Sequence, residues 1–267
     1  MSSSWLYELD SIWIVLALLL ATVAAGELGC HLGRRYHPRT DEARIGHLRT
    51  ILGSVLGMLA LLLSFTFAMS AQRYNERREL VVRDANALGK LYLQSDFLPD
   101  GPRKAYKQLL GQYVDLRAQI AFLHRDSTDQ ETAQAAAQSE GIHQQMWKVV
   151  QAGTDSQSLQ ALDMHKGLID AASVYRERIF SWESHVPDPV IWLLLLGAVT
   201  AMGAVGFFGG LGNHRGLPAR IAVTLMLCGT IYVVMDLDKP HQGWVRISQS
   251  PILYLKQILD SDPETLN

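Results

Sequence analysis

The stretch TILGSVLGMLALLLSFTFAMSA, from Thr50 to Ala71, decides the fold of this chain. It is 22 residues long and holds no ionisable side chain, while Arg49 precedes it and Arg73 follows it closely. A helix of that length, at about 1.5 Å rise per residue, crosses a hydrocarbon core of roughly 30 Å. The sequence therefore predicts a membrane-spanning helix here.

Three further apolar blocks also predict membrane helices. The block 12–29 is interrupted only by Glu27, and since no Lys or Arg precedes it, a retained helix is expected rather than a signal peptide. The block 189–211 opens with Pro189 at a helix-start position. The fourth, about 219–236, is apolar only from 221 to 235, so it spans if Arg220 snorkels outward and Asp236 lies at the interface.

Short connectors pair these spans into two hairpins, and the polar stretch between the pairs predicts an extramembrane domain. We expect an all-α protein in which this domain is a helical bundle formed by long extensions of spans 2 and 3. The expected organisation is an N-terminal transmembrane hairpin at 1–71 (spans about 12–29 and 50–71), the bundle at 72–188, a C-terminal transmembrane hairpin at 189–237 (spans about 189–211 and 219–236), and a C-terminal tail at 238–267.

Helical periodicity predicts which faces of the bundle helices are buried. In the stretch from Arg103 to Arg125 the expected face carries Tyr106, Leu109, Leu110, Tyr113, Leu116 and Ile120. In the stretch from Ser156 to Ser184 it carries Leu159, Leu162, His165, Ile169, Ala172 and Arg176.

The composition of the 267-residue chain is typical of a membrane protein, because 48% of its residues are hydrophobic and they are gathered in long blocks. The 24 Lys and Arg nearly balance the 26 Asp and Glu. No basic excess is available to neutralise phosphates, so nucleic acid is not an expected partner. Cys30 and Cys228 lie in or beside apolar blocks, which excludes a disulfide scaffold of the secreted kind.

The sequence carries no motif of a common enzyme class. It has no phosphate-binding glycine loop, nucleophile elbow, CxxC or HExxH. Glu140 and His143 have the i, i+3 spacing of di-iron ligands, but no second Glu-x-x-His occurs. We therefore expect neither an enzyme nor a cofactor.

The orientation in the membrane stays open, because the rule that counts Lys and Arg near the spans gives nearly equal totals on the two faces. One face has Arg34, Arg35, Arg39, Arg44 and Arg49. The other has Arg73, Arg77, Arg78 and Arg83 after span 2, with Arg176, Arg178, Lys239 and Arg246 beside the later spans.

Two pairs of ionisable residues lie at membrane edges. Glu27 and His31 share one helix face at the end of span 1, either as an ion-binding or gating position or as an interfacial pair that snorkels toward neighbouring arginines. Asp236 and Asp238 follow span 4, where two acids could bind a cation or cap the helix end against Lys239.

Span 2 carries a stripe of small residues, which we call the span 2 stripe. At about 100° per residue, one side of the helix holds Gly53, Gly57, Ala60, Ser64, Phe67 and Ala71. Small residues permit close helix approach. The stripe predicts either packing within one subunit or a common axis at which several copies meet. In the second case it would line a narrow pore, constricted by Phe67 or its neighbour Phe65.

Several motifs resemble the bacterial family of bestrophin-like membrane proteins. They are LLLSFTFAMSAQRYNERRELVVRDANALGKLYL at 61–93, Leu98-Pro99, YVDLR at 113–117, His185-Val186-Pro187 and DLDKPHQGWVRISQSP at 236–251. Relatedness to true bestrophins would imply a pentameric anion channel with its pore along span 2, an aromatic neck at Phe65 and Phe67, and a cytosolic helical domain. The chain departs from bestrophins in lacking their acidic calcium clasp, since it offers only Asp236 and Asp238.

The sequence leaves two functional hypotheses. The first is a homo-oligomeric, anion-conducting channel of a bacterial inner membrane, with the lipid bilayer and small inorganic ions as its other partners. The alternative is a membrane-anchored sensor or scaffold, in which the helical bundle binds a signal or partner.

Overall fold

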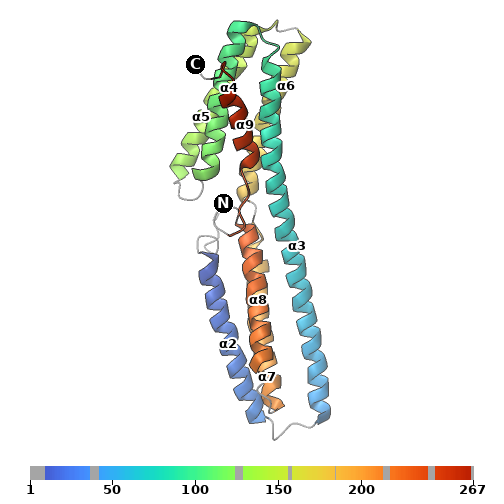
Figure 1. Ribbon diagram of the computed structural model, residues 1–267. Helices are drawn as coiled ribbons and strands as arrows, with labels where there is room; N and C mark the ends of the chain where they lie inside the picture. Colours follow the sequence, from blue (N-terminus) through green and yellow to red (C-terminus); the bar gives the residue numbers. More distant parts are fainter. Residues whose placement is uncertain are drawn as a thin grey trace. The chain divides into compact units, whose positions relative to one another are not determined.

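The computed structural model describes residues 10–36, 42–123, 129–155, 158–183, 185–212, 217–239 and 244–265. Within these ranges the chain is helical and contains no strand, which confirms the predicted all-α fold (Figure 1). The helices are α2 (Ser11–Tyr36), α3 (Glu42–Ser95), α4 (Asp100–Leu123), α5 (Asp129–Gly153), α6 (Leu159–Glu183), α7 (Asp188–Leu211), α8 (Leu217–Asp238) and α9 (Ser250–Ser261).

Four of the described helices are long and apolar enough to cross a membrane, and they are the four predicted spans. They lie at Ser11–Tyr36, Thr50–Ser95, Asp188–Leu211 and Arg220–Asp238. The apolar block of the fourth span is short, but α8 begins before it, at Leu217, and is therefore long enough to cross the membrane. Pro218 lies in the first turn of α8, where proline is favoured.

Helix α3 continues without a break from apolar into polar sequence. No glycine or proline occurs between Gly57 and Gly89, so nothing interrupts the backbone hydrogen bonds of the helix. The chain forms two compact units, and α3 contributes to both. The membrane unit comprises residues 1–74 and 185–245, and the bundle unit comprises residues 75–184 and 246–267.

In the membrane unit, α2 and α7 touch backbone to backbone. A Cβ atom on Gly29 would lie 2.1 Å from the Gly203 carbonyl oxygen, and one on Gly206 would lie 2.0 Å from the Gly26 oxygen. Only glycine fits such positions, as in other close membrane-helix contacts. Around this contact the core is apolar and includes Ile14, Leu18, Leu59, Ala198, Ala201, Leu227 and Ile231.

In the bundle unit, one core joins the second half of α3 to α4, α5, α6 and α9. Its fully buried members include Leu88, Leu91, Tyr106, Leu110, Tyr113, Met146, Val150, Met164, Leu168 and Ile252. The predicted face of α4 is confirmed for Tyr106, Leu110, Tyr113 and Leu116, while the side chain of Ile120 lies outside the described residues.

The predicted face of α6 was wrong. Leu159 is 85% exposed, and Leu162 and Ile169 are each 51% exposed. The buried face instead holds Ala161, Met164, Gly167, Leu168 and Ala171. Small residues let α6 approach α3 closely, since a Cβ on Gly167 would lie 3.0 Å from Leu91. Large apolar residues occur on both faces of α6, whereas the small residues Ala161, Gly167 and Ala171 lie on the face that packs.

The segment 238–267, expected as a tail, contains helix α9. Residues Ile252, Leu255 and Leu259 recur at helical spacing and are buried in the core of the bundle unit. Pro251 stands in the first turn of α9, where its missing N–H costs no helical hydrogen bond. The C-terminal segment is therefore part of the packed unit.

Candidate functional site

The span 2 stripe is the main candidate site, and α3 presents it on an exposed face of the single chain. Gly53, Gly57, Ala60, Ser64 and Phe67 are exposed and Ala71 is half-buried. Apart from the adjoining backbone of α3 itself, no atom of the described residues lies within 4 Å of the Cβ position of Gly53 or Gly57. Within the described residues, the helix therefore leaves its small-residue face unpacked.

A different face of span 2 packs into the membrane unit. Leu59, Thr66 and Ser70 are buried, with Leu59 in the core between α2, α7 and α8. Thr66 Oγ1 donates to the Leu62 carbonyl oxygen at 2.8 Å, which satisfies its hydroxyl inside the helix. This anchoring fixes the rotation of α3 and thereby decides which residues remain on the exposed side.

Phe65 and Phe67 point in nearly opposite directions from the helix axis. They are two residues apart, which on an α-helix is a rotation of about 200°. Both rings are exposed, Phe65 by 62% and Phe67 by 41%. Of the two, Phe67 is the one that shares the face of Gly53, Ala60 and Ser64.

Glu27 lies beside a partner that sequence analysis did not identify. Its Oε1 is 3.0 Å from Nη2 of Arg220 in α8, whereas the expected neighbours were arginines at the end of α2. The Glu27 side chain is 62% exposed and that of Arg220 only 11%. His31 is exposed on α2, one turn further along.

Asp236 and Asp238 are occupied by donors from the protein. Asp236 accepts hydrogen bonds from the backbone amides of Trp244 and Val245, at 3.0 and 2.9 Å. Asp238 accepts one from the Val186 amide at 2.8 Å and lies 3.6 Å from Nη1 of Arg73. The two carboxylates thus fasten the chain that leaves α8 and the chain that enters α7.

In the part of the chain that the structure describes, no group of three or more His, Cys, Asp or Glu side chains could hold a metal ion. Glu140 accepts a hydrogen bond from the Gln144 side chain at 3.4 Å. The ring centroids of His143 and Trp147 lie 6.4 Å apart in a tilted arrangement, and burial lowers the pKa of the His143 imidazole. Glu140 is exposed and His143 is half-buried.

A buried charge cluster in the bundle unit was missed by sequence analysis. Arg178 Nη1 lies 2.8 Å and Arg117 Nη1 3.5 Å from the two oxygens of Asp84. All three side chains are almost wholly buried, and Arg117 also stacks on the Tyr175 ring at 3.3 Å. Two guanidinium groups share one carboxylate, so the formal charges of these three side chains sum to +1.

A local signal could have revealed this cluster. Asp84 stands four residues before the buried Leu88 and three after the buried Val81, so it occupies a core position on the apolar face of α3. A carboxylate there requires a cationic partner. Its partners, Arg117 and Arg178, are 33 and 94 residues away in sequence, and no spacing rule connects them.

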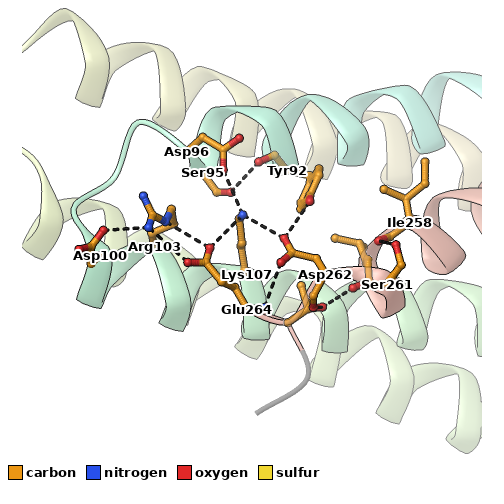
Figure 2. Close-up of polar contacts among 12 residues, drawn as sticks. Tyr92, Ser95, Asp96, Asp100, Arg103, Lys107, Ile258, Ser261, Asp262 and Glu264 are labelled. Atoms are coloured by element: carbon orange, nitrogen blue, oxygen red, sulfur yellow. Dashed lines mark hydrogen bonds and ion pairs between the residues drawn. The ribbon is translucent and has the colours of Figure 1, made fainter.

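A second cluster holds the C-terminal segment against α3 and α4 (Figure 2). Nζ of Lys107 lies 3.0 Å from Asp96, 3.0 Å from Asp262 and 3.1 Å from Glu264. Tyr92 donates its hydroxyl to Asp262 at 2.8 Å, and Arg103 lies 3.2 Å from Glu264. We call these six residues the C-terminal clamp.

The contacts of the clamp shift the pKa of Asp262, Glu264 and Lys107 in the direction that favours the charged form. Burial raises the pKa of the Asp262 carboxyl, but hydrogen bonds from the Glu264 amide, Tyr92 and Lys107 outweigh it and lower the pKa overall. Hydrogen bonds from Lys107 and Arg103 lower the pKa of Glu264. Burial lowers the pKa of Lys107, but its three carboxylate partners raise it above the ordinary value.

Comparison with known structures shows that the fold is shared. A crystal structure of a bacterial Bestrophin homolog from Klebsiella pneumoniae matches with a TM-score of 0.67 and 16% identity, over 93% of this chain and 96% of that chain. A mutant form of a bacterial Bestrophin homolog from the same organism matches with a TM-score of 0.68 and 17% identity, over 92% and 97%. Comparison with curated proteins finds no match.

The family is shown by the sequence as a whole. A family model described as the Bestrophin-like domain matches residues 13–252. That range includes all but the first two residues of the four apolar helices, together with the span 2 stripe and the Asp84 cluster. This chain therefore belongs to the bestrophin-like family of proteins.

Proposed function

We propose that this membrane protein is a homo-oligomeric ion channel, with a pore lined by the span 2 stripe of several copies. The observation that carries the proposal is the unpacked state of the stripe. α2, α7 and α8 pack on one another and on Leu59, yet no described residue of another helix lies within 4 Å of the Cβ position of Gly53 or Gly57. A small-residue face of this kind suits close approach to other copies around an axis.

The chemistry of the stripe suits a narrow apolar pore. It contains no ionisable side chain, and the Ser64 hydroxyl is its one side-chain hydrogen-bonding group. Phe67, three residues from Ser64, would narrow the path, and an apolar ring of this kind gates by dewetting. The direction of Phe65, about 200° around the helix from Phe67, suits contact with neighbouring helices or lipid.

The charge pattern of the sequence favours anions. Arg49 precedes Gly53 by four residues, which places both on the same side of a helix. In an oligomer these arginines would form a positive ring at one mouth of the pore, and such rings favour anions over cations. No carboxylate stands on the span 2 stripe to oppose them.

Exposed apolar side chains in the bundle unit support assembly from several copies. Leu93 of α3 and Phe97 in the turn after it are 66% and 68% exposed, and Leu159 and Phe180 of α6 are 85% and 65% exposed. Large apolar groups at the surface of a polar unit mark contacts with other chains.

The resemblance to bestrophins implies that the oligomer has five subunits. It also implies that the protein lies in a bacterial inner membrane.

The deciding experiment is conductance of the purified protein in planar bilayers. With a KCl gradient, we expect single-channel currents whose reversal potential lies toward that of chloride. Native mass spectrometry of the same sample should give a pentamer. A pure oligomer that passes no current under any anion or cation gradient would contradict the proposal.

A groove in the bundle unit favours the second candidate, a sensor or scaffold. It lies between α4 and α5, has a volume of about 490 Å³, and includes Gln112, Gln119, Gln138 and Gln145 in its lining. Amide side chains can both donate to and accept from a polar ligand. A partner-dependent phenotype that persists when Ser64 and Phe67 are both replaced by Leu would favour this candidate over the channel.

A further inference from the structure

A pocket in the membrane unit lies between α2, α7 and α8 and has a volume of about 240 Å³. Its walls include Leu19 and Val23 of α2, Met202 of α7, and Ile221 and Leu225 of α8. Val23, Ile221 and Leu225 are 49%, 51% and 59% exposed. Because these exposed apolar residues belong to membrane helices, the pocket opens toward the hydrocarbon of the bilayer.

The interior of the pocket is apolar in effect, although two threonines line it. Thr22 Oγ1 donates to the Leu18 carbonyl oxygen at 2.8 Å, and Thr224 Oγ1 donates to the sulfur of Met202 at 3.8 Å. Both hydroxyls are therefore satisfied within the protein. A hydrocarbon chain suits such a pocket, whereas water or an ion would lack polar partners.

One end of the pocket carries a pair of opposite charges. Arg220 and Glu27 both line it and lie 3.0 Å apart. Arg220 keeps a further donor, because its Nε is buried and has no acceptor among the described residues. Gly26 makes room for the guanidinium, since a Cβ there would lie 2.8 Å from Nη2 of Arg220. Glu27 remains 62% exposed and able to accept from a second cation.

We propose that this pocket binds one phospholipid that carries an amine headgroup. One acyl chain occupies the pocket, the Arg220 guanidinium donates to the phosphate, and the Glu27 carboxylate accepts from the headgroup ammonium. Pockets that hold a whole drug-sized ligand have a volume of about 300 Å³ or more. This pocket is smaller, and its volume suits part of one acyl chain. The assignment does not depend on whether the protein conducts ions.

The test is the phospholipid that stays bound to the protein during purification in a mild detergent from bacterial membranes, quantified by mass spectrometry. We expect enrichment of phosphatidylethanolamine over phosphatidylglycerol. Arg220→Gln should lower the retained amount about tenfold, as expected from the loss of a charge-assisted phosphate contact. Val23→Trp, which fills the mouth of the pocket, should lower it similarly.

Matched controls separate the pocket from the general lipid surface. Leu28→Trp places the same bulk on an exposed position of α2 outside the pocket, and Arg35→Gln removes a charge from an exposed position at the end of the same helix. Both should retain the lipid as the wild type does. Equal retention in Val23→Trp and Leu28→Trp would overturn the proposal, as would equal amounts of the two phospholipids on the wild type.

The double variant Glu27→Arg with Arg220→Glu tests whether the pair is only structural. It keeps an ion pair between α2 and α8 but exchanges its ends. If the pair only fastens the helices, this variant keeps both its thermal stability and its lipid. If the pair binds the lipid headgroup, the variant keeps its thermal stability but no longer retains the lipid. Unchanged lipid retention in a folded double variant would contradict the assignment.

Discussion

The ammonium group of Lys107 lies 3.0 Å from the carboxylate of Asp262, across 155 residues of sequence. This contact centres the C-terminal clamp, in which Lys107 also meets Asp96 and Glu264. The clamp joins the end of the chain to α4 and to the end of α3, so its charge state decides how firmly α9 is held.

The first prediction concerns the acid stability of the clamp. The pKa values of Asp262 and Glu264 are lowered, so their contribution is complete above the ordinary carboxyl values of 3.8 and 4.5 and is lost as the pH falls through the lowered values. Melting temperatures of the wild type should therefore be insensitive to these two groups between about pH 5 and pH 8 and should fall below about pH 4.

Asp262→Asn tests this directly. It removes one of the three carboxylates that contact Lys107 and the charged acceptor of the Tyr92 hydroxyl, which should cost about 1 to 2 kcal/mol at neutral pH. The melting temperature of the variant should also fall less at acid pH than that of the wild type, and melting temperatures measured across the pH range test this. The same acid dependence in variant and wild type would show that Asp262 is not a source of it.

The second prediction concerns Asp84. Asp84→Asn removes the carboxylate that lies against both Arg117 and Arg178 in this buried cluster, which should cost about 3 kcal/mol or more. Thermal unfolding in detergent measures it. The matched control is Arg83→Gln, which breaks the half-exposed pair with Glu177 and should change stability by about 0 to 1 kcal/mol.

The third prediction separates the two phenylalanines of span 2. Phe67→Ala should widen the constriction and raise the leak current in planar bilayers, because Phe67 shares the face of Ser64. Phe65→Ala removes the same atoms on nearly the opposite side of the helix and should leave conductance near the wild-type value. The reverse result would place the pore along a different face of α3.

The fourth prediction concerns ion selectivity. Arg49→Gln removes one positive charge per copy from the side of α3 that carries Gly53. The preference for chloride over potassium should fall by about fivefold, or roughly 1 kcal/mol. Arg44, five residues earlier, is nearly opposite on a helix, so Arg44→Gln should have little effect. Reversal potentials in a KCl gradient give both ratios.

The fifth prediction concerns the contact between α2 and α7. Gly206→Ala would place a methyl group 2.0 Å from the Gly26 carbonyl oxygen and should destabilise the protein by about 2 kcal/mol. Gly229→Ala on α8 meets nothing within 4 Å and should be neutral or stabilising by up to about 1 kcal/mol. Melting temperatures that fall equally in both variants would argue against a specific contact at Gly206.

Sequence alone predicted the four spans, the continuity of α3 and the buried face of α4, because apolar length and helical period are local properties. It failed on α6, where Gly167 and Ala171 are buried while Leu159 and Ile169 are exposed. It also missed the partner of Glu27, since Arg220 is 193 residues away. Pairings of this kind are set by which helices become neighbours, and a single sequence does not record that.

The glycine contact of α2 and α7 also decides which helices can move. The backbones of α2 and α7 touch with no side chains between them. Because no side chains can repack at this contact, the two helices are expected to move together. The span 2 part of α3 is different, since only 11% of the residues in its most apolar stretch are buried by the described chain. In the proposed channel, α3 would then be the helix that moves on opening and closing, by sliding along its own axis past the fixed pair of α2 and α7.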